Sequence, residues 1–189
     1  MTLTTQALPR LRAHLSTFFS GHEATEDVWL EGPLAQRAPW FSVLRFAPGP
    51  RTPLWTYASI GASALDNPRD ALLEFVVVVE KPTRRAVELL TMTADYHADH
   101  GLGPGHTGGF GEPWLPGADC EDFLISLPYP FGPDLEICQL DDRHVHFLWL
   151  LPITGAERRF AVDHGLEALE QRFESSGLRY WSKRRASVV

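Results

Sequence analysis

Histidine and aspartate side chains gather at one place in this sequence and form its clearest group of potentially catalytic residues. They are Asp95, His97, Asp99, His100 and His106. Imidazoles and carboxylates hold zinc in proteins, so a metal-dependent hydrolase is one hypothesis. The spacing is poor for this purpose, because two ligands on one helical turn are best placed four residues apart, whereas His97 and His100 are three apart. The alternative interpretation is a polar helix end, where a protonated histidine is stabilised by the negative pole of the helix dipole.

A second pair, His144 and His146, alternates with apolar residues in a predicted strand. Residues two apart on a strand point to the same face, so both rings could bind one metal ion. The same pattern is typical of a strand whose first residues are partly exposed, and we prefer that interpretation. Our first prediction is therefore that the chain has no catalytic residue, no metal and no cofactor.

Neither thiol is placed as a nucleophile. Cys120 lies among three neighbouring carboxylates, which raise the pKa of a thiol and so reduce its reactivity. Cys120 and Cys138 are too few for a disulfide framework or a four-sulfur zinc site, so we expect buried, reduced thiols. The sequence also lacks a G-x-S-x-G motif, and its glycine-rich segment 101–111 fits neither a phosphate-binding loop nor a dinucleotide fingerprint.

Aromatic residues at predicted strand ends and in proline-rich loops indicate binding instead. They are Trp55, Tyr57, Trp114, Tyr129 and Phe131. Aromatic side chains are favoured anchors of protein interfaces. Any one of them could equally cap the end of a sheet. As a set near the long loop, they favour a binding groove.

Hydrophobic periodicity predicts the elements that must position these residues. Helices are expected over 8–19, from Pro82 to 97–100, over 155–163 and over 165–176. Strands are expected at 28–30, 40–46, 54–60, 71–80 and 122–127, followed by a hairpin of 135–140 and 143–151. Segment 101–119 should be a long irregular loop. This order predicts an α+β fold with a mixed, largely antiparallel central sheet and helices packed on it.

The boundary between the last strand and the last two helices is the most detailed local prediction. His144–Leu151 is almost continuously apolar, which is typical of a central strand covered on both faces. Pro152 should end this strand, because it has no N–H to donate. Thr154 and Glu157 have the spacing of a capping box, so a helix should begin there.

Length and charge limit the classes of function. A chain of 189 residues suits one domain. Its net charge of −7 argues against a nucleic-acid partner and suits a basic protein partner, although the same charge also promotes solubility. We find no apolar run long enough to cross a membrane and no signal peptide, so we expect a cytoplasmic protein with no membrane contact.

A series of short motifs in a fixed order carries a resemblance to a known family. They are W-x-Y-x-S-x-G at 55–61, the run 73–77, Gly105-His106, the run 147–153, Glu157 and the run 165–169. This order resembles the suppressor-of-fused domain in its compact bacterial form. The resemblance divides the chain into an N-terminal helical extension, 1–26, and a suppressor-of-fused-like domain, 27–189, within a single globular unit.

The resemblance implies a protein-binding domain without catalysis. The animal member sequesters a zinc-finger transcription factor of the Hedgehog pathway, but it has an additional C-terminal domain, so that partner is not expected here. Similar bacterial domains are associated with polymorphic toxin systems, which implies an immunity protein that occludes a basic toxin domain. The segment matching Trp55 to Asp66 borders the animal partner-binding cleft. We therefore predict Trp55, Tyr57 and Asp66 as partner contacts, with the looser match at Asp66.

Two alternatives stay open beside this hypothesis. One is a metal-dependent hydrolase that uses His97, His100 and His106. The other is a general protein-interaction scaffold with no link to toxins. The sequence predicts neither the identity of the partner nor the oligomeric state.

Overall fold

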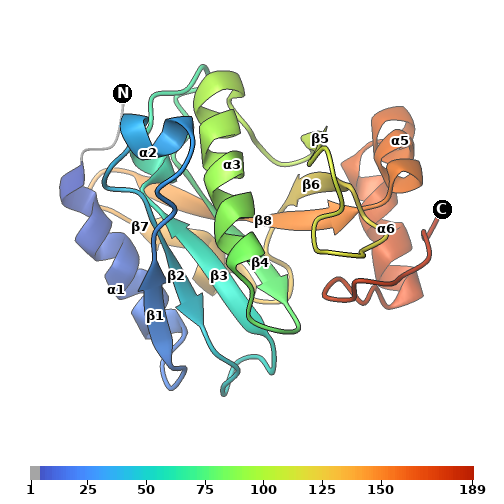
Figure 1. Ribbon diagram of the computed structural model, residues 1–189, viewed down its shortest axis with the longest axis horizontal. Helices are drawn as coiled ribbons and strands as arrows, with labels where there is room; N and C mark the ends of the chain where they lie inside the picture. The colour runs from blue at the N-terminus through green and yellow to red at the C-terminus, as the bar shows by residue number, and fades with distance from the viewer. Residues whose placement is uncertain (1–4) are drawn as a thin grey trace.

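An eight-stranded sheet forms the centre of the computed structural model, which describes residues 5–189 (Figure 1). Its strand order is β1-β2-β3-β4-β8-β6-β5, and β7 pairs with β8 outside this path. The strands are β1 (Ala24–Asp27), β2 (Ser42–Phe46), β3 (Trp55–Ile60), β4 (Leu73–Val79), β5 (Thr107–Gly109), β6 (Asp122–Ser126), β7 (Ile137–Gln139) and β8 (His144–Ile153). Only β4 and β8 are parallel; the other recorded pairs are antiparallel. The predicted mixed, largely antiparallel sheet is confirmed.

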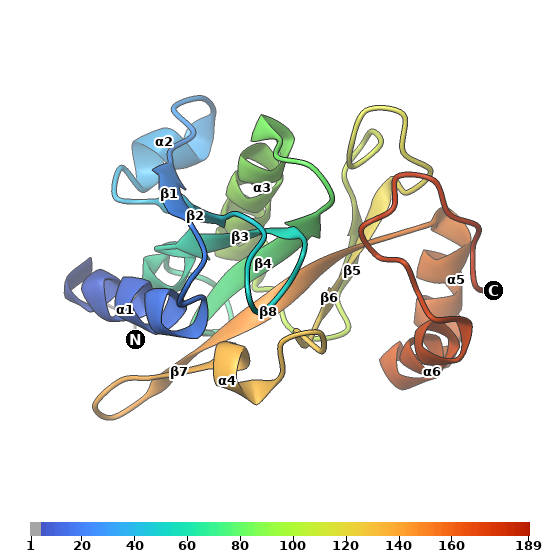
Figure 2. The same cartoon turned by 90° about the horizontal axis from the view of Figure 1, so that it is seen from below.

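Helices cover both faces of this sheet and its far end (Figures 1 and 2). Figure 2 shows α2 and α3 on one face, α1 and α4 on the other, and α5 and α6 beside the end of β8. The helices are α1 (Leu8–Phe18), α2 (Pro33–Arg37), α3 (Arg84–His100), α4 (Pro133–Glu136), α5 (Gly155–His164) and α6 (Leu166–Ser176), with short 3-10 turns η1 (Thr5–Ala7) and η2 (Ala62–Ala64). The α+β fold class is therefore confirmed, with helices on both faces.

Strand β4 shows that the sheet is covered on both faces. Its seven residues are all buried, and successive side chains point to opposite faces. Phe75 and Val77 pack in the core beneath α3, whereas Val76 packs in the core beneath α1. The continuous apolar run is thus that of a central strand, as its sequence predicted.

A third, smaller core joins the end of β8 to α5 and α6. It contains Trp149 and Leu151 of β8 together with Leu169 and Phe173 of α6. The predicted capping box is present at the start of α5, where Thr154 and Glu157 satisfy each other's backbone N–H groups. The box therefore places Thr154, the N-cap of α5, directly after the last residue of β8.

Several sequence predictions for local structure were wrong. Segment 101–119, expected to be an irregular loop, contains β5, and the first two residues of the strand expected at 135–140 lie in α4. The strand expected at 28–30 is irregular, and the edge strand is β1, whose polar sequence ATED has no apolar alternation. Helix α2 was missed because it is only one short turn that begins at Pro33. Pro152 does not end β8, which continues to Ile153. It is tolerated because β4 pairs with β8 only as far as Trp149, so Pro152 faces an open edge on that side.

Residues 1–26, expected as a helical extension, contain η1, α1 and most of β1, while the first four lie outside the described residues. The buried side of α1 contributes Leu11 and Leu15 to the core beneath the sheet. Within residues 5–189, no helix combines the length and apolar character that a membrane span requires.

Candidate functional site

The structure does not assemble the predicted histidine cluster into a metal site. His97 is fully buried, and its Nδ1 accepts a hydrogen bond from the Leu102 N–H at 3.0 Å, while its Nε2 donates to the Ala71 carbonyl at 3.3 Å. The His100 ring packs on Tyr96 instead. Across residues 5–189, no group of three or more His, Cys, Asp or Glu side chains is placed to hold a metal ion. His97 therefore anchors the end of α3 to the neighbouring loops.

The burial of His97 gives stability a specific pH dependence. Desolvation lowers the pKa of His97 from 6.5 to about 4, whereas the unfolded chain protonates at the ordinary value. This contribution is complete above pH 6.5 and declines as the pH falls towards 4, because the unfolded state then binds the extra proton. We expect a loss on the order of 3 kcal/mol in the free energy of unfolding across that interval.

Chemical denaturation at a series of pH values tests this expectation. The variant His97→Gln should lose this part of the slope, and the control His100→Gln should keep it because His97 is retained. Equal slopes in the wild-type protein and His97→Gln would show that His97 is not the responsible group.

The other predicted reactive groups are also placed for structure. The rings of His144 and His146 lie on one side of β8, with centroids 4.7 Å apart, and His146 Nδ1 is 3.1 Å from a carboxylate oxygen of Glu136. Both cysteines are buried, as predicted. Burial raises the pKa of Cys120 to about 11 and also raises that of Cys138, so neither thiol is activated.

The three predicted partner contacts lie at different places along β3. Tyr57 is fully buried, and its hydroxyl accepts a hydrogen bond from the Thr83 N–H, which precedes α3. Trp55 is half-buried at the start of β3, with the Arg45 guanidinium 5.8 Å from its ring centre. Asp66 is exposed and follows η2, beyond the other end of β3. The structure therefore does not bring the three side chains together.

The Trp55 end of β3 borders a small hollow of about 270 Å³. Its lining includes Arg45, Thr83 and Arg84. Through Arg45 and Thr83, this hollow is adjacent to Trp55 and Tyr57. Contact of a partner with Trp55, Tyr57 and Asp66 stays a prediction.

The W-x-Y-x-S-x-G motif has a structural role around the buried carboxylate of Glu74. The Ser59 hydroxyl donates to Glu74 Oε2 at 2.5 Å, and the N–H groups of Gly61, Ala62 and Ser63 donate at 2.8, 3.2 and 3.1 Å. The Ser63 hydroxyl adds a fifth bond at 2.7 Å. Gly61 has a φ of +108°, which favours glycine. Burial raises the pKa of Glu74, and the hydrogen bonds from Ser59, Gly61 and Ser63 oppose that rise.

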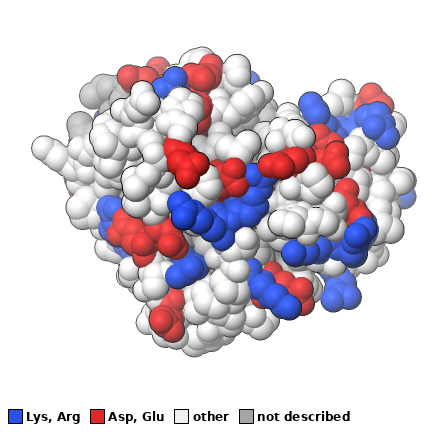
Figure 3. All heavy atoms as spheres, in the orientation of Figure 1, with Lys and Arg blue, Asp and Glu red and all other residues white. Residues whose placement is uncertain are grey.

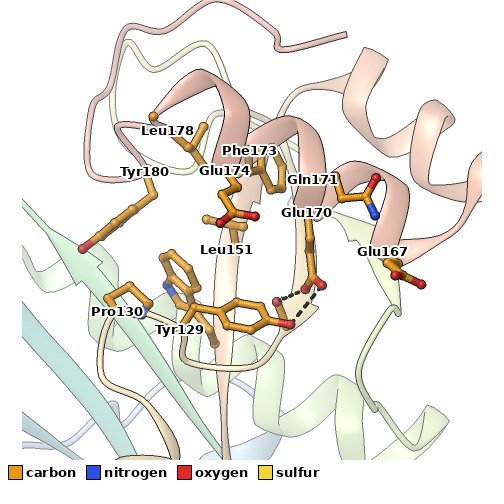
Figure 4. Close-up of a pocket in the computed structure, with 13 residues that line it drawn as sticks. Tyr129, Pro130, Leu151, Glu167, Glu170, Gln171, Phe173, Glu174, Leu178 and Tyr180 are labelled. Carbon is orange, nitrogen blue, oxygen red and sulfur yellow. Dashed lines mark hydrogen bonds between the residues drawn. The ribbon is translucent and has the colours of Figure 1, made fainter.

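A large hollow lies between β8, α6 and two loops, with a volume of about 680 Å³ (Figure 4). We name it the α6 groove and define it by its lining: Ser126, Tyr129, Pro130, Trp149, Leu151, Glu167, Glu170, Gln171, Phe173, Glu174, Gly177, Leu178 and Tyr180. This volume is within the range of ligand-binding pockets, roughly 300–1,000 Å³.

Secondary structure explains how the α6 groove is built. Trp149 and Leu151 are two residues apart on β8 and therefore share one face. Glu167, Glu170 and Glu174 lie along one side of α6, because residues three and four apart on a helix are neighbours. Leu151, Phe173 and Trp149 form an apolar floor with at most 7% of each side chain exposed.

Hydrogen bonds fix one of the three glutamates in place. Glu170 accepts from the Ser126 hydroxyl at 2.6 Å and from the Tyr129 hydroxyl at 3.0 Å, shown as dashed lines in Figure 4. Desolvation, and then this bond to Glu170, raise the pKa of Tyr129. Glu167 and Glu174 are exposed and form no recorded ion pair within residues 5–189. The groove thus combines apolar area with carboxylates that lack a cationic partner.

Sequence reasoning found only part of this groove. Tyr129 belonged to the aromatic set predicted to bind, but Trp114 of that set is fully buried and Phe131 packs on Phe18 and Phe19. The glutamates of α6 were missed as a group. Their spacing on one helix face was visible, although the proximity of α6 to Trp149 depends on the fold.

Comparisons with known proteins agree with this architecture. The sequence matches the family model described as suppressor of fused protein over residues 38–186. A crystal structure of a suppressor of fused homolog from Neisseria gonorrhoeae FA 1090 has a TM-score of 0.84 and 32% sequence identity, and the likeness covers 98% of both chains. No curated protein matches the sequence.

Two more distant structures share the fold. A chain of the Sufu–Fu complex crystal structure has a TM-score of 0.67 and 16% identity, covering 96% of this chain and 92% of that chain. Drosophila suppressor of fused has a TM-score of 0.67 and 15% identity, covering 96% of this chain and 51% of that chain. This chain therefore spans about half of the Drosophila protein, and these two likenesses concern the fold alone.

Proposed function

Because this chain belongs to the suppressor of fused family, we propose that it acts by binding another protein and catalyses no reaction. The observation that carries this proposal is the family match over residues 38–186, together with full-length likeness to the Neisseria homolog. A structural neighbour was crystallised as part of a Sufu–Fu complex. Both ring nitrogens of the buried His97 are already hydrogen-bonded, and the pKa of the Cys120 thiol is high. Neither side chain is therefore suited to act as a nucleophile or a metal ligand.

More specifically, we propose a cytoplasmic immunity protein that occludes a basic toxin domain. The net charge of −7 supports a cationic partner, because opposite charge speeds the capture of a protein. On the face drawn in Figure 3, acidic and basic residues are intermixed, so the net negative charge forms no single acidic patch on that face. The acidic lining of the α6 groove supplies a local region of one sign.

Capture followed by a growth test examines this proposal. The chain is used to isolate a partner from its own source cells, and the partner is then expressed alone and together with the chain. An immunity protein predicts that the partner alone arrests growth and that co-expression restores it. A captured partner that is harmless would support a general interaction scaffold and contradict the toxin link. Failure to capture any protein under native conditions would count against protein binding itself.

A further inference from the structure

We propose that the α6 groove holds an arginine side chain carried by an apolar segment of the partner. This inference rests on the proposed function, because it specifies which chemistry the partner presents to the chain. It follows from three independent properties of the groove: its charge, its aromatic walls and its apolar floor.

The acidic lining of the groove favours a positively charged ligand. Three of its lining residues are glutamates, and none is Lys or Arg. Glu170 is already bonded to Ser126 and Tyr129 within the protein, so its position is fixed before any partner arrives. Glu167 and Glu174 have no recorded ion pair in the described part of the chain. Two carboxylates thus stand beside a fixed third one, and a positive side chain would relieve their mutual repulsion.

Aromatic walls favour a guanidinium over other cations. Tyr129 is 58% exposed, and Tyr180 makes an edge-on contact with Trp149, with ring centroids 4.7 Å apart. Figure 4 shows Glu174, Tyr129 and Tyr180 around the same hollow. A guanidinium can stack on an aromatic face while donating two hydrogen bonds to a carboxylate, whereas an ammonium is a compact and strongly hydrated charge.

The apolar floor and the volume of the groove indicate that residues next to the arginine in the partner also bind in the groove. Trp149, Leu151 and Phe173 form the floor, where a polar backbone alone would gain little. The volume of about 680 Å³ exceeds what one side chain requires and has room for flanking aliphatic residues. The site is therefore expected to prefer a short segment in which an arginine is flanked by leucine or similar residues.

Titration of the purified full chain with synthetic peptides tests this inference without the natural partner. The probe is the acetylated and amidated peptide Ala-Leu-Arg-Leu-Ala, and its control carries citrulline, which has the shape of arginine but no charge. Binding is followed by amide and indole NMR shifts. We expect the arginine peptide to shift groove residues and the citrulline peptide to bind about tenfold more weakly, as the loss of about 1.4 kcal/mol implies. A peptide with lysine in place of arginine should bind with an affinity between those of the arginine and citrulline peptides.

Matched variants separate the groove from the general negative charge. The double variant Glu167→Gln and Glu174→Gln should bind the arginine peptide about tenfold more weakly, because each exposed ion pair contributes up to about fivefold to the affinity. Its affinity for the citrulline peptide should be unchanged. The control double variant Glu31→Gln and Glu80→Gln removes the same charge from exposed positions outside the groove lining and should leave both peptides unchanged.

Three results would overturn the assignment. They are equal binding of the arginine and citrulline peptides, shifts confined to residues outside the groove, and no detectable binding of the arginine peptide at millimolar concentration. Each would remove the arginine site while leaving the capture and growth tests of the proposed function untouched. Conversely, peptide binding in a chain that captures no protein would contradict the proposed function alone.

Discussion

Replacing Glu74 with alanine will lower the free energy of unfolding by more than about 4 kcal/mol, which is a large part of the total stability of a typical domain. The carboxylate is fully buried and accepts five hydrogen bonds from β3, η2 and Gly61 between them. Removing it leaves three backbone N–H groups and two hydroxyls without an acceptor. Each buried donor left unsatisfied costs about 1–3 kcal/mol, and partial entry of water reduces the sum. Urea denaturation of the wild-type protein and Glu74→Ala measures the difference.

Two further variants make this prediction specific to the carboxylate. Glu74→Gln keeps the size of the side chain but turns one acceptor into a donor that faces other donors, so it should cost at least about 2 kcal/mol. Glu80→Gln, at an exposed position directly after the same strand, should change stability by less than about 0.5 kcal/mol. If Glu74→Ala were within about 1 kcal/mol of the wild-type protein, the structural account of the W-x-Y-x-S-x-G motif would be wrong.

Replacing Arg185 with alanine is expected to cost about 3–5 kcal/mol, because it leaves a buried charge without its partner. Arg185 donates to both carboxylate oxygens of Glu157, at 2.6 and 2.7 Å, and to the Pro152 carbonyl at 3.0 Å. The side chains of Arg185 and Glu157 are 7% and 0% exposed. Glu157 also accepts from the N–H groups of Thr154 and Val188, so this one ion pair joins the capping box to the C-terminal tail.

The neighbouring residue provides a matched control for this prediction. Arg184 forms an ion pair with Asp119 at 2.9 Å, but its side chain is 77% exposed. Arg184→Ala should therefore cost no more than about 1 kcal/mol. Guanidinium denaturation of both variants compares the two ion pairs. Similar small losses for both would mean that the tail is not held by Arg185 and that the end of the chain leaves the protein surface readily.

The sequence predicted elements whose signal is local or strongly periodic. The valine run of β4, the apolar run of β8, and the capping box of Thr154 and Glu157 were all visible, since each depends on neighbouring residues. The exposed polar strand β1 gave no periodic signal. Strand β8 can continue past Pro152 because its pairing with β4 ends at Trp149. The position of that end depends on the arrangement of the sheet and cannot be inferred from the proline itself.

The candidate sites were less predictable because they combine distant segments. The motif around Ser59 and Gly61 was recognised, but nothing in its residues showed that Glu74 would be the group they surround. The α6 groove joins Tyr129 of a loop, Trp149 of a strand and Glu174 of a helix. The basic segment 183–185 looked like a mixed tail, yet it is docked against Asp119 and Glu157. Long-range contacts of this kind leave no periodic trace in a single sequence.

The association rate constant with the captured partner, measured at low and high salt, tests most directly the claim that this chain works by binding a basic protein through an acidic surface. Between ionic strengths of about 0.01 M and 1 M, the Debye length falls from about 30 Å to about 3 Å. We predict that the rate falls at least about tenfold over this interval. We also predict a reduced low-salt rate for the double variant Glu167→Gln and Glu174→Gln. A rate that is the same at both salt concentrations and in both proteins would contradict the account.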